Sequence, residues 1–188
     1  MLYLSYMKPV IIFLLALLPF GVAAQDISSL NTAGTVALMR HALAPGGGDP
    51  ADFKLNDCST QRNLSDRGRA QARAIGQMIR DADIRFDQVW TSQWCRTRET
   101  ARLLNVGPVI DKPALNSFFQ DRSTAQAQRQ EILAGLAALP KDAKVLLVTH
   151  QVNISGLAGT STRSGEIIVA KRNADGTLSP VDRIVIAP

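Results

Sequence analysis

Two apolar runs that end in a histidine decide the fold of this chain: TVALMRH at residues 35–41 and KVLLVTH at residues 144–150. Short apolar runs of this kind predict buried strands. In an open α/β sheet, ligands bind in the crevice beyond the carboxyl ends of the strands. The chain has two histidines, and we expect the rings of His41 and His150 to meet over one crevice, within about 10 Å of each other.

Strand and helix patterns alternate along the rest of the chain. Ser65 is typical of a helix N-cap, and the spacing after it predicts a helix from Asp66 to about Arg80. Residues 88–92 predict a second strand with a helix behind it, and residues 166–171 and 178–186 predict two strands joined by an Asp-Gly turn. The order predicts an α/β three-layer sandwich, with a mostly parallel central sheet, helices on both faces and an antiparallel C-terminal hairpin.

The first 24 residues have the pattern of an export signal. Lys8 precedes an apolar stretch from Val10 to Leu18, and Val22-Ala23-Ala24 supplies the small residues of a cleavage site. The stretch is short against the roughly 20 apolar residues that a membrane-spanning helix needs. We expect residues 1–24 to be a signal peptide and residues 25–188 a single periplasmic or secreted domain, in contact with a membrane only through the leader before cleavage. A membrane anchor is the alternative.

The net charge of +5 comes mainly from an arginine-rich middle of the chain. Such a charge suits an anionic ligand, although a solvated surface has the same composition. The aromatic residues are few and are not interleaved with the basic ones, so we expect no nucleic-acid partner.

Cys58 and Cys95 are the two cysteines of the chain. An exported protein matures where disulfides persist, which favours a bridge between them. Free thiols, one of them nucleophilic, are the alternative.

Arg40, His41, Arg96 and His150 are all expected at carboxyl ends of strands or in the helix turn that follows. Arg96 falls in the first turn of its helix, off the apolar line. Permanent cations beside the histidines would repel a metal ion, whereas guanidinium forks match phosphate oxygens. A neutral imidazole can attack phosphorus and carry the phosphoryl group covalently. We therefore expect phosphoryl chemistry with no metal and no cofactor.

The glycine-rich segment PGGGDP at residues 45–50 follows the first histidine run. It lacks the Gly-Lys-Ser/Thr ending of a phosphate-binding P-loop. The composition therefore predicts a flexible connector.

Several blocks resemble the histidine phosphatase superfamily, the clan of cofactor-dependent phosphoglycerate mutases and histidine acid phosphatases. They are LMRHA at residues 38–42, NLSDRGRAQA at 63–72, TSQWCRTRETA at 91–101, VTH at 148–150 and SGE at 164–166. They follow the family's order across most of the chain beyond the leader. The resemblance implies that His41 is the nucleophile, that Arg40 and Arg96 bind phosphate, and that His150 binds the phosphoryl group.

The chain departs from the family pattern at two places. Many members place a glutamate soon after the leucine that corresponds to Leu115, as proton donor to the leaving group, whereas here Asn-Ser-Phe-Phe follows. The nearest acid is Asp121, which we expect to act as general acid or to cap a helix. Gln151 follows the second histidine in place of the family's Gly, Ala or Asp, so substrate contacts there are expected to differ. Arg62 is expected to be a third phosphate contact or a solvated side chain.

Together these patterns predict a phosphomonoesterase that works through a phosphohistidine intermediate on an unidentified substrate. The substrate is expected to be a phosphorylated small molecule or an envelope sugar, such as a lipopolysaccharide core heptose, and a protein phosphohistidine has equal standing. The alternatives are a phospho-ligand-binding module with little or no turnover, and a phosphomutase, which export disfavours.

Overall fold

The computed structural model describes residues 25–186, so the predicted signal peptide lies outside the described residues. One six-stranded sheet has the order β3-β2-β4-β1-β5-β6. Its strands are β1 (Val36–Arg40), β2 (Gln88–Thr91), β3 (Val109–Asp111), β4 (Val145–Thr149), β5 (Ile167–Arg172) and β6 (Leu178–Ile184). The α-helices are α1 (Asp66–Asp81), α2 (Cys95–Leu104), α3 (Ala125–Ala137) and α4 (Gln151–Ala158), and short 3₁₀ turns are η1 (Ser28–Asn31), η2 (Cys58–Thr60), η3 (Pro113–Leu115) and η4 (Arg122–Thr124). None of the helices between residues 25 and 186 has the length and apolar character needed to cross a membrane.

Strands β1 to β4 pair with one another in parallel, and β5 and β6 form the antiparallel pairings. β1 and β3 lie parallel to their neighbours β4 and β2, and β2 also pairs with β4 in parallel. β5 runs antiparallel to β1, and β6 antiparallel to β5. The predicted mostly parallel sheet with a C-terminal hairpin is confirmed, and the hairpin closes through a hydrogen bond from Asn173 N to Thr177 O of 2.8 Å.

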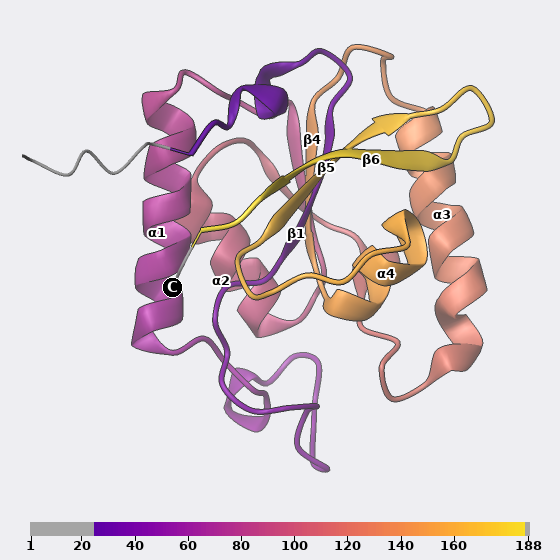
Figure 1. The fold of residues 1–188 in the computed structure, drawn as a ribbon. Coiled ribbons are helices and arrows are strands. Elements are labelled where there is room, and N and C mark those ends of the chain that lie inside the picture. Colours follow the sequence, from indigo (N-terminus) through magenta and orange to yellow (C-terminus); the bar gives the residue numbers. More distant parts are fainter. Residues whose placement is uncertain (1–24, 187–188) are drawn as a thin grey trace, which may run out of the picture.

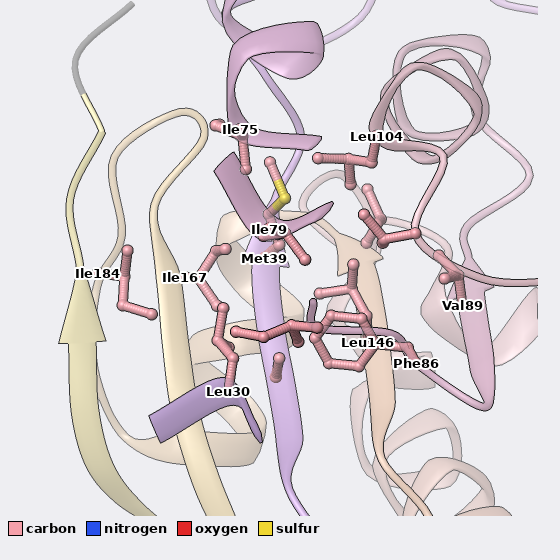
Figure 2. Close-up of a cluster of buried hydrophobic side chains, with 14 of the residues drawn as sticks. Leu30, Met39, Ile75, Ile79, Phe86, Val89, Leu104, Leu146, Ile167 and Ile184 are labelled. Atoms are coloured by element: carbon pink, nitrogen blue, oxygen red, sulfur yellow. The ribbon is translucent and has the colours of Figure 1, made fainter. Parts of the chain in front are cut away.

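Helices cover both faces of the sheet, with α1 and α2 on one side and α3 and α4 on the other (Figure 1). Alternate residues of a strand point to opposite faces. Met39 of β1 therefore packs in the cluster with α1 and α2, and Leu38 packs in the cluster with α3 and α4. Figure 2 shows the first cluster, in which Ile75 and Ile79 of α1 lie over the sheet. Burial on both faces explains why β1 and β4 are continuous apolar runs.

The two helices on the first face approach each other closely. A Cβ at Gly76 of α1 would lie 2.1 Å from the carbonyl oxygen of Leu104 at the end of α2. Only a glycine allows this approach without a shift of backbone. Since α2 begins directly at the candidate site, the contact helps to set the position of that helix.

The sheet ends on the β6 side in an irregular edge. The β5–β6 register shifts between Val169 and Ala170, and Val169 pairs with Asp182 while Ala170 pairs with Pro180. Val181 is therefore an extra residue and is 57% exposed. Pro180 has no N–H, which is tolerated at an edge strand.

Candidate active site

The two histidines meet at the carboxyl ends of neighbouring strands. Arg40 and Thr149 are paired residues of β1 and β4, so His41 and His150 follow them side by side. Their ring centroids lie 5.6 Å apart with an interplanar angle of 68°. The rings are buried, with residue exposures of 2% for His41 and 4% for His150. The structure thus brings together two side chains that are 109 residues apart in the sequence.

The protonation of His41 is set by its own backbone neighbour. Its Nδ1 lies 2.8 Å from the carbonyl oxygen of Ala42. A carbonyl only accepts, so Nδ1 donates, and a neutral ring then carries its lone pair on Nε2. Burial and the charge of Arg96 lower the pKa of His41 to about 3, with smaller contributions from Arg40 and Arg62. The ring is therefore neutral at neutral pH and has a free nucleophilic nitrogen.

His150 uses both ring nitrogens inside the protein. Nδ1 lies 3.4 Å from Nη2 of Arg96, which can only donate, so Nδ1 accepts. Nε2 then carries the proton and donates to Oγ of Ser92 at 2.9 Å. The Ser92 hydroxyl donates in turn to Oδ1 of Asn116 at 3.3 Å. Burial, the electrostatic interaction with the neighbouring His41 ring and the charge of Arg96 lower the pKa of His150 well below its ordinary value.

Three guanidinium groups line the same cleft as the two histidines, those of Arg40, Arg62 and Arg96. Arg96 is 2% exposed although it lies off the apolar line of α2. The Nε–H groups of Arg40 and Arg96 are buried and have no hydrogen-bond partner within the described structure. Buried donors are nearly always paired, so these two fit a site whose acceptors are the oxygens of an anion.

Arg62 holds the glycine-rich loop through two backbone carbonyls. Its Nε donates to Gly48 O at 2.8 Å, and its Nη1 donates to Ala44 O. The side chain is half-buried and lines the cleft, so it is not the solvated arginine that the sequence left open.

Asp49 is the site residue that sequence reasoning missed. The prediction that residues 45–50 are only a flexible connector is wrong, because Asp49 pairs with Arg96 through both carboxylate oxygens, Oδ1 to Nη1 at 2.5 Å and Oδ2 to Nη2 at 3.1 Å. Trp94 Nε1 donates to Oδ2 at 3.0 Å, and the Asp49 side chain is 7% exposed. Burial raises the pKa of Asp49, but hydrogen bonds and charge from Arg96 outweigh it and leave the pKa below its usual value.

The only signal for Asp49 in the sequence was indirect. It is an acid in the loop directly behind the first histidine run, in a chain whose predicted site contained the arginines Arg40 and Arg96 and, as its one carboxylate, Asp121 much further along the chain. A search for the counter-charge of those arginines would have led to it.

The predicted bridge between Cys58 and Cys95 is present, with a Cα–Cα distance of 5.7 Å. It joins η2, in the loop behind His41, to the first residue of α2. The side-chain oxygen of Gln61 also accepts a hydrogen bond from Cys95 N at 2.9 Å. Two links therefore hold the loop against the helix turn that carries Arg96.

Asp121 is not brought together with the other predicted site residues. It is exposed, and its carboxylate accepts hydrogen bonds from Ser123 N at 2.9 Å and Ser123 Oγ at 2.6 Å at the start of η4. Asn116, in the segment where the family glutamate was sought, accepts from Gln93 N at 2.9 Å through Oδ1. Among the described residues that line the cleft, Asp49 is the one acid.

The cleft has a volume of about 240 Å³. A second hollow of about 520 Å³ lies between α3 and α4 and shares Gln151 and Val152 with it. The two hollows are therefore neighbours. Residues 25–186 contain no group of three or more His, Cys, Asp or Glu side chains that could hold a metal ion.

Comparisons with known proteins find similarity in sequence and in fold. Residues 36–119 match the sequence model of the histidine phosphatase superfamily, branch 1. The chain is 35% identical over 137 residues to the mitochondrial serine/threonine-protein phosphatase Pgam5 of Drosophila virilis, an alignment that covers 59% of this chain. The chain spans about half the length of that relative, 47%.

Two solved structures share the fold. A structure named for the phosphohistidine phosphatase SixA of Agrobacterium tumefaciens is 19% identical, with a TM-score of 0.56 over 82% of this chain and 99% of that one. The protein histidine phosphatase SixA complexed with tungstate is 16% identical, with a TM-score of 0.54 over 80% of this chain and 96% of that one. The chain is therefore similar to the histidine phosphatase superfamily in sequence over residues 36–119, and it shares the α/β fold of these solved structures.

Proposed function

We propose that the protein is a phosphomonoesterase that transfers the phosphoryl group of its substrate to His41 and then hydrolyses the phosphohistidine. One observation carries the proposal: a neutral His41 with a free Nε2 lies in a cleft with a second histidine and three guanidinium groups. A neutral nucleophile and fixed positive charge are what a phosphate ester requires, because the ester is an anion that must be bound and attacked at once.

In the first half of the reaction, Nε2 of His41 attacks phosphorus and the bond from phosphorus to the leaving oxygen breaks. Arg40, Arg62 and Arg96 bind the non-bridging oxygens and stabilise their charge in the transition state. The phosphorylated ring gains positive charge, which the hydrogen bond from Nδ1 to Ala42 O stabilises. His150 lies beside His41 and is held by Ser92 and Arg96, and it binds the phosphoryl group by exchanging one of these partners for a phosphate oxygen.

In the second half, water attacks the phosphorus atom and the bond to Nε2 breaks. Inorganic phosphate leaves, and His41 returns to its neutral state. Metal independence belongs to the proposal, since the three guanidinium groups carry the positive charge that a divalent cation would otherwise supply.

We further propose that the protein acts after export, in the periplasm or outside the cell. The predicted leader at residues 1–24 and the disulfide between Cys58 and Cys95 support this location. The substrate class is a phosphomonoester, from a phosphorylated small molecule or envelope sugar. A protein phosphohistidine is an equal candidate, because two of the matched proteins are named as a serine/threonine-protein phosphatase and a protein histidine phosphatase.

The test uses the disulfide-bonded protein with p-nitrophenyl phosphate from acid to neutral pH. Phosphate release is expected to survive a chelator, to be inhibited by vanadate and to disappear in His41→Gln. A wild-type protein quenched during turnover with radiolabelled substrate is expected to carry an acid-labile phosphate that His41→Gln lacks. Phosphate binding without hydrolysis and without this label would identify a binding module and overturn the proposal.

A further inference from the structure

We infer that Asp49 is the catalytic acid that protonates the leaving group, an inference that rests on the proposed phosphomonoesterase function. An alkoxide is a poor leaving group, so hydrolysis of an alkyl phosphate needs a proton donor within hydrogen-bond reach of the leaving oxygen. Asp49 is the one acid among the described residues that line the cleft with His41 and His150.

The other candidates in or near the cleft are already committed elsewhere. Asn116 has no acidic proton and is bonded to Ser92 and Gln93. Both ring nitrogens of His150 are engaged, with Ser92 and Arg96. Asp121 is exposed and caps η4.

Asp49 now occupies the place at which a phosphate group would be bound. Its two carboxylate oxygens accept hydrogen bonds from the two Nη groups of Arg96, and Oδ2 also accepts a hydrogen bond from Trp94 Nε1. A carboxylate and a phosphate compete for the same guanidinium geometry. Binding of substrate at Arg96 therefore displaces Asp49 but leaves it beside the phosphoryl group.

The loop that carries Asp49 is built to allow this displacement. It contains Gly46, Gly47 and Gly48, and a Cβ at Gly47 or Gly48 would meet no other atom within 4 Å. Glycine gives the backbone access to conformations that other residues rarely adopt. Arg62 holds the loop only through the carbonyls of Gly48 and Ala44, so the side chain of Asp49 is not itself part of that anchor.

The displacement of Asp49 from Arg96 also explains how the Asp49 carboxylate becomes protonated. Once Arg96 binds the phosphate, Asp49 loses its ion pair and faces an anion, and both changes favour its protonated form. The proton comes from the phosphomonoester monoanion, which gives it to the Asp49 carboxylate as it binds as a dianion. As the bond from Nε2 of His41 to phosphorus forms and the bond to the leaving oxygen breaks, that proton moves to the leaving oxygen and an alcohol departs.

The second half of the reaction restores the starting state. The Asp49 carboxylate takes a proton from the water that attacks phosphorus, and the bond between phosphorus and Nε2 breaks. Phosphate leaves with that proton, and the pair between Asp49 and Arg96 forms again.

The test compares two substrates in Asp49→Asn, which keeps the shape of the side chain but removes the acidic proton. p-Nitrophenyl phosphate has a leaving group that departs without a proton, whereas glycerol 2-phosphate does not. We expect kcat/KM for glycerol 2-phosphate to fall by about 10²- to 10⁴-fold and that for the aryl ester by less than about tenfold. Asp49→Glu is expected to recover part of the alkyl activity, and Asp121→Asn, the matched control, to change neither substrate.

Three results would contradict the inference. Equal losses of kcat/KM on both substrates would show that Asp49 is only a structural partner of Arg96. Equal gains would show that it only competes with phosphate. In both cases the proposed function stands if the wild type forms phospho-His41. A wild type that forms no phosphoenzyme would overturn the function and the inference together. Thermal unfolding of each variant with its disulfide intact separates all these outcomes from a failure to fold.

Discussion

The half of the site built on the sheet is held by hydrophobic packing, whereas the half built on the loop of residues 44–62 is held by hydrogen bonds, one ion pair and one disulfide. In the sheet half, His41 and His150 are 2% and 4% exposed. In the loop half, Asp49 binds the guanidinium group of Arg96, and Arg62 donates to two backbone carbonyls of the loop. The nucleophile thus has a fixed position, and the groups that must exchange with substrate are held by contacts that water and phosphate can replace.

The largest expected effect concerns the pH dependence of stability in the sheet half. Folding lowers the pKa of His41 to about 3 and that of His150 well below 6.5. Above pH 6.5 the rings are neutral in both the folded and unfolded states, so stability is at its full value. As the pH falls below 6.5, the unfolded chain binds protons that the folded chain does not, and stability declines at up to about 1.4 kcal/mol per histidine and pH unit.

Between pH 6.5 and about pH 4.5 the expected loss of unfolding free energy from His41 alone is about 2 kcal/mol, and His150 adds to it in the same direction. Urea unfolding at a series of pH values measures it. In His41→Gln the slope of stability against pH is expected to fall, because only His150 still contributes. A stability that does not change over this window would show that the rings titrate normally and that the sheet half is open to water.

The second prediction concerns the link between the halves. The disulfide joins residues 37 positions apart, and removal of such a bridge costs about 3–4 kcal/mol in the chain-entropy description. Cys58→Ser/Cys95→Ser is expected to unfold at correspondingly lower urea concentration and to lose kcat/KM through the loop half. Unchanged activity at a temperature where the variant is folded would mean that Arg62 and Gln61 hold the loop without the bridge.

The third prediction isolates the group shared by both halves. Arg96→Lys keeps the positive charge but removes the guanidinium group that can bind two phosphate oxygens at once, so kcat/KM is expected to fall about 10²-fold. Arg98→Lys is the matched control, because Arg98 lies two residues further along α2 and pairs with Asp111 at the surface. A loss of similar size in both variants would assign the effect to the helix and not to the site.

The smallest effect compares the same change in the two regions. Gly76→Ala places a Cβ 2.1 Å from Leu104 O and is expected to cost about 2 kcal/mol of stability. Gly47→Ala, in the loop half, meets no atom within 4 Å and is expected to shift stability by less than about 0.5 kcal/mol. Thermal unfolding measures both, and an equal cost would show that the loop is packed as tightly as the helices.

The sheet half was predictable because its cause is local in sequence. A parallel strand buried on both faces must be a continuous apolar run, so residues 36–40 and 145–149 could be recognised, and each histidine follows its strand directly. The hairpin was predictable for the same reason, since Asp175-Gly176 supplies the positive φ of 81° that its turn needs at Gly176.

The loop half was not predictable because its contacts have no periodicity. Asp49 meets Arg96, a residue 47 positions away, and only the fold brings the two together. The same contact explains why Arg96 is buried despite its place off the apolar line of α2: an ion pair satisfies its charge where apolar packing could not. Asp121 was predicted because it is the acid nearest to Leu115 along the sequence, whereas the acid that lines the cleft, Asp49, comes from a distant part of the chain.

The irregular edge at β6 has a consequence for how copies of this protein behave in concentrated solution. An exposed edge strand can recruit a strand from another molecule and start intermolecular sheet growth. Here Pro180 removes one donor, and the extra residue Val181 breaks the spacing that an incoming strand would have to match. Asp182 and Arg183 place charges next to this break, so the edge is a poor template for fibrillar assembly.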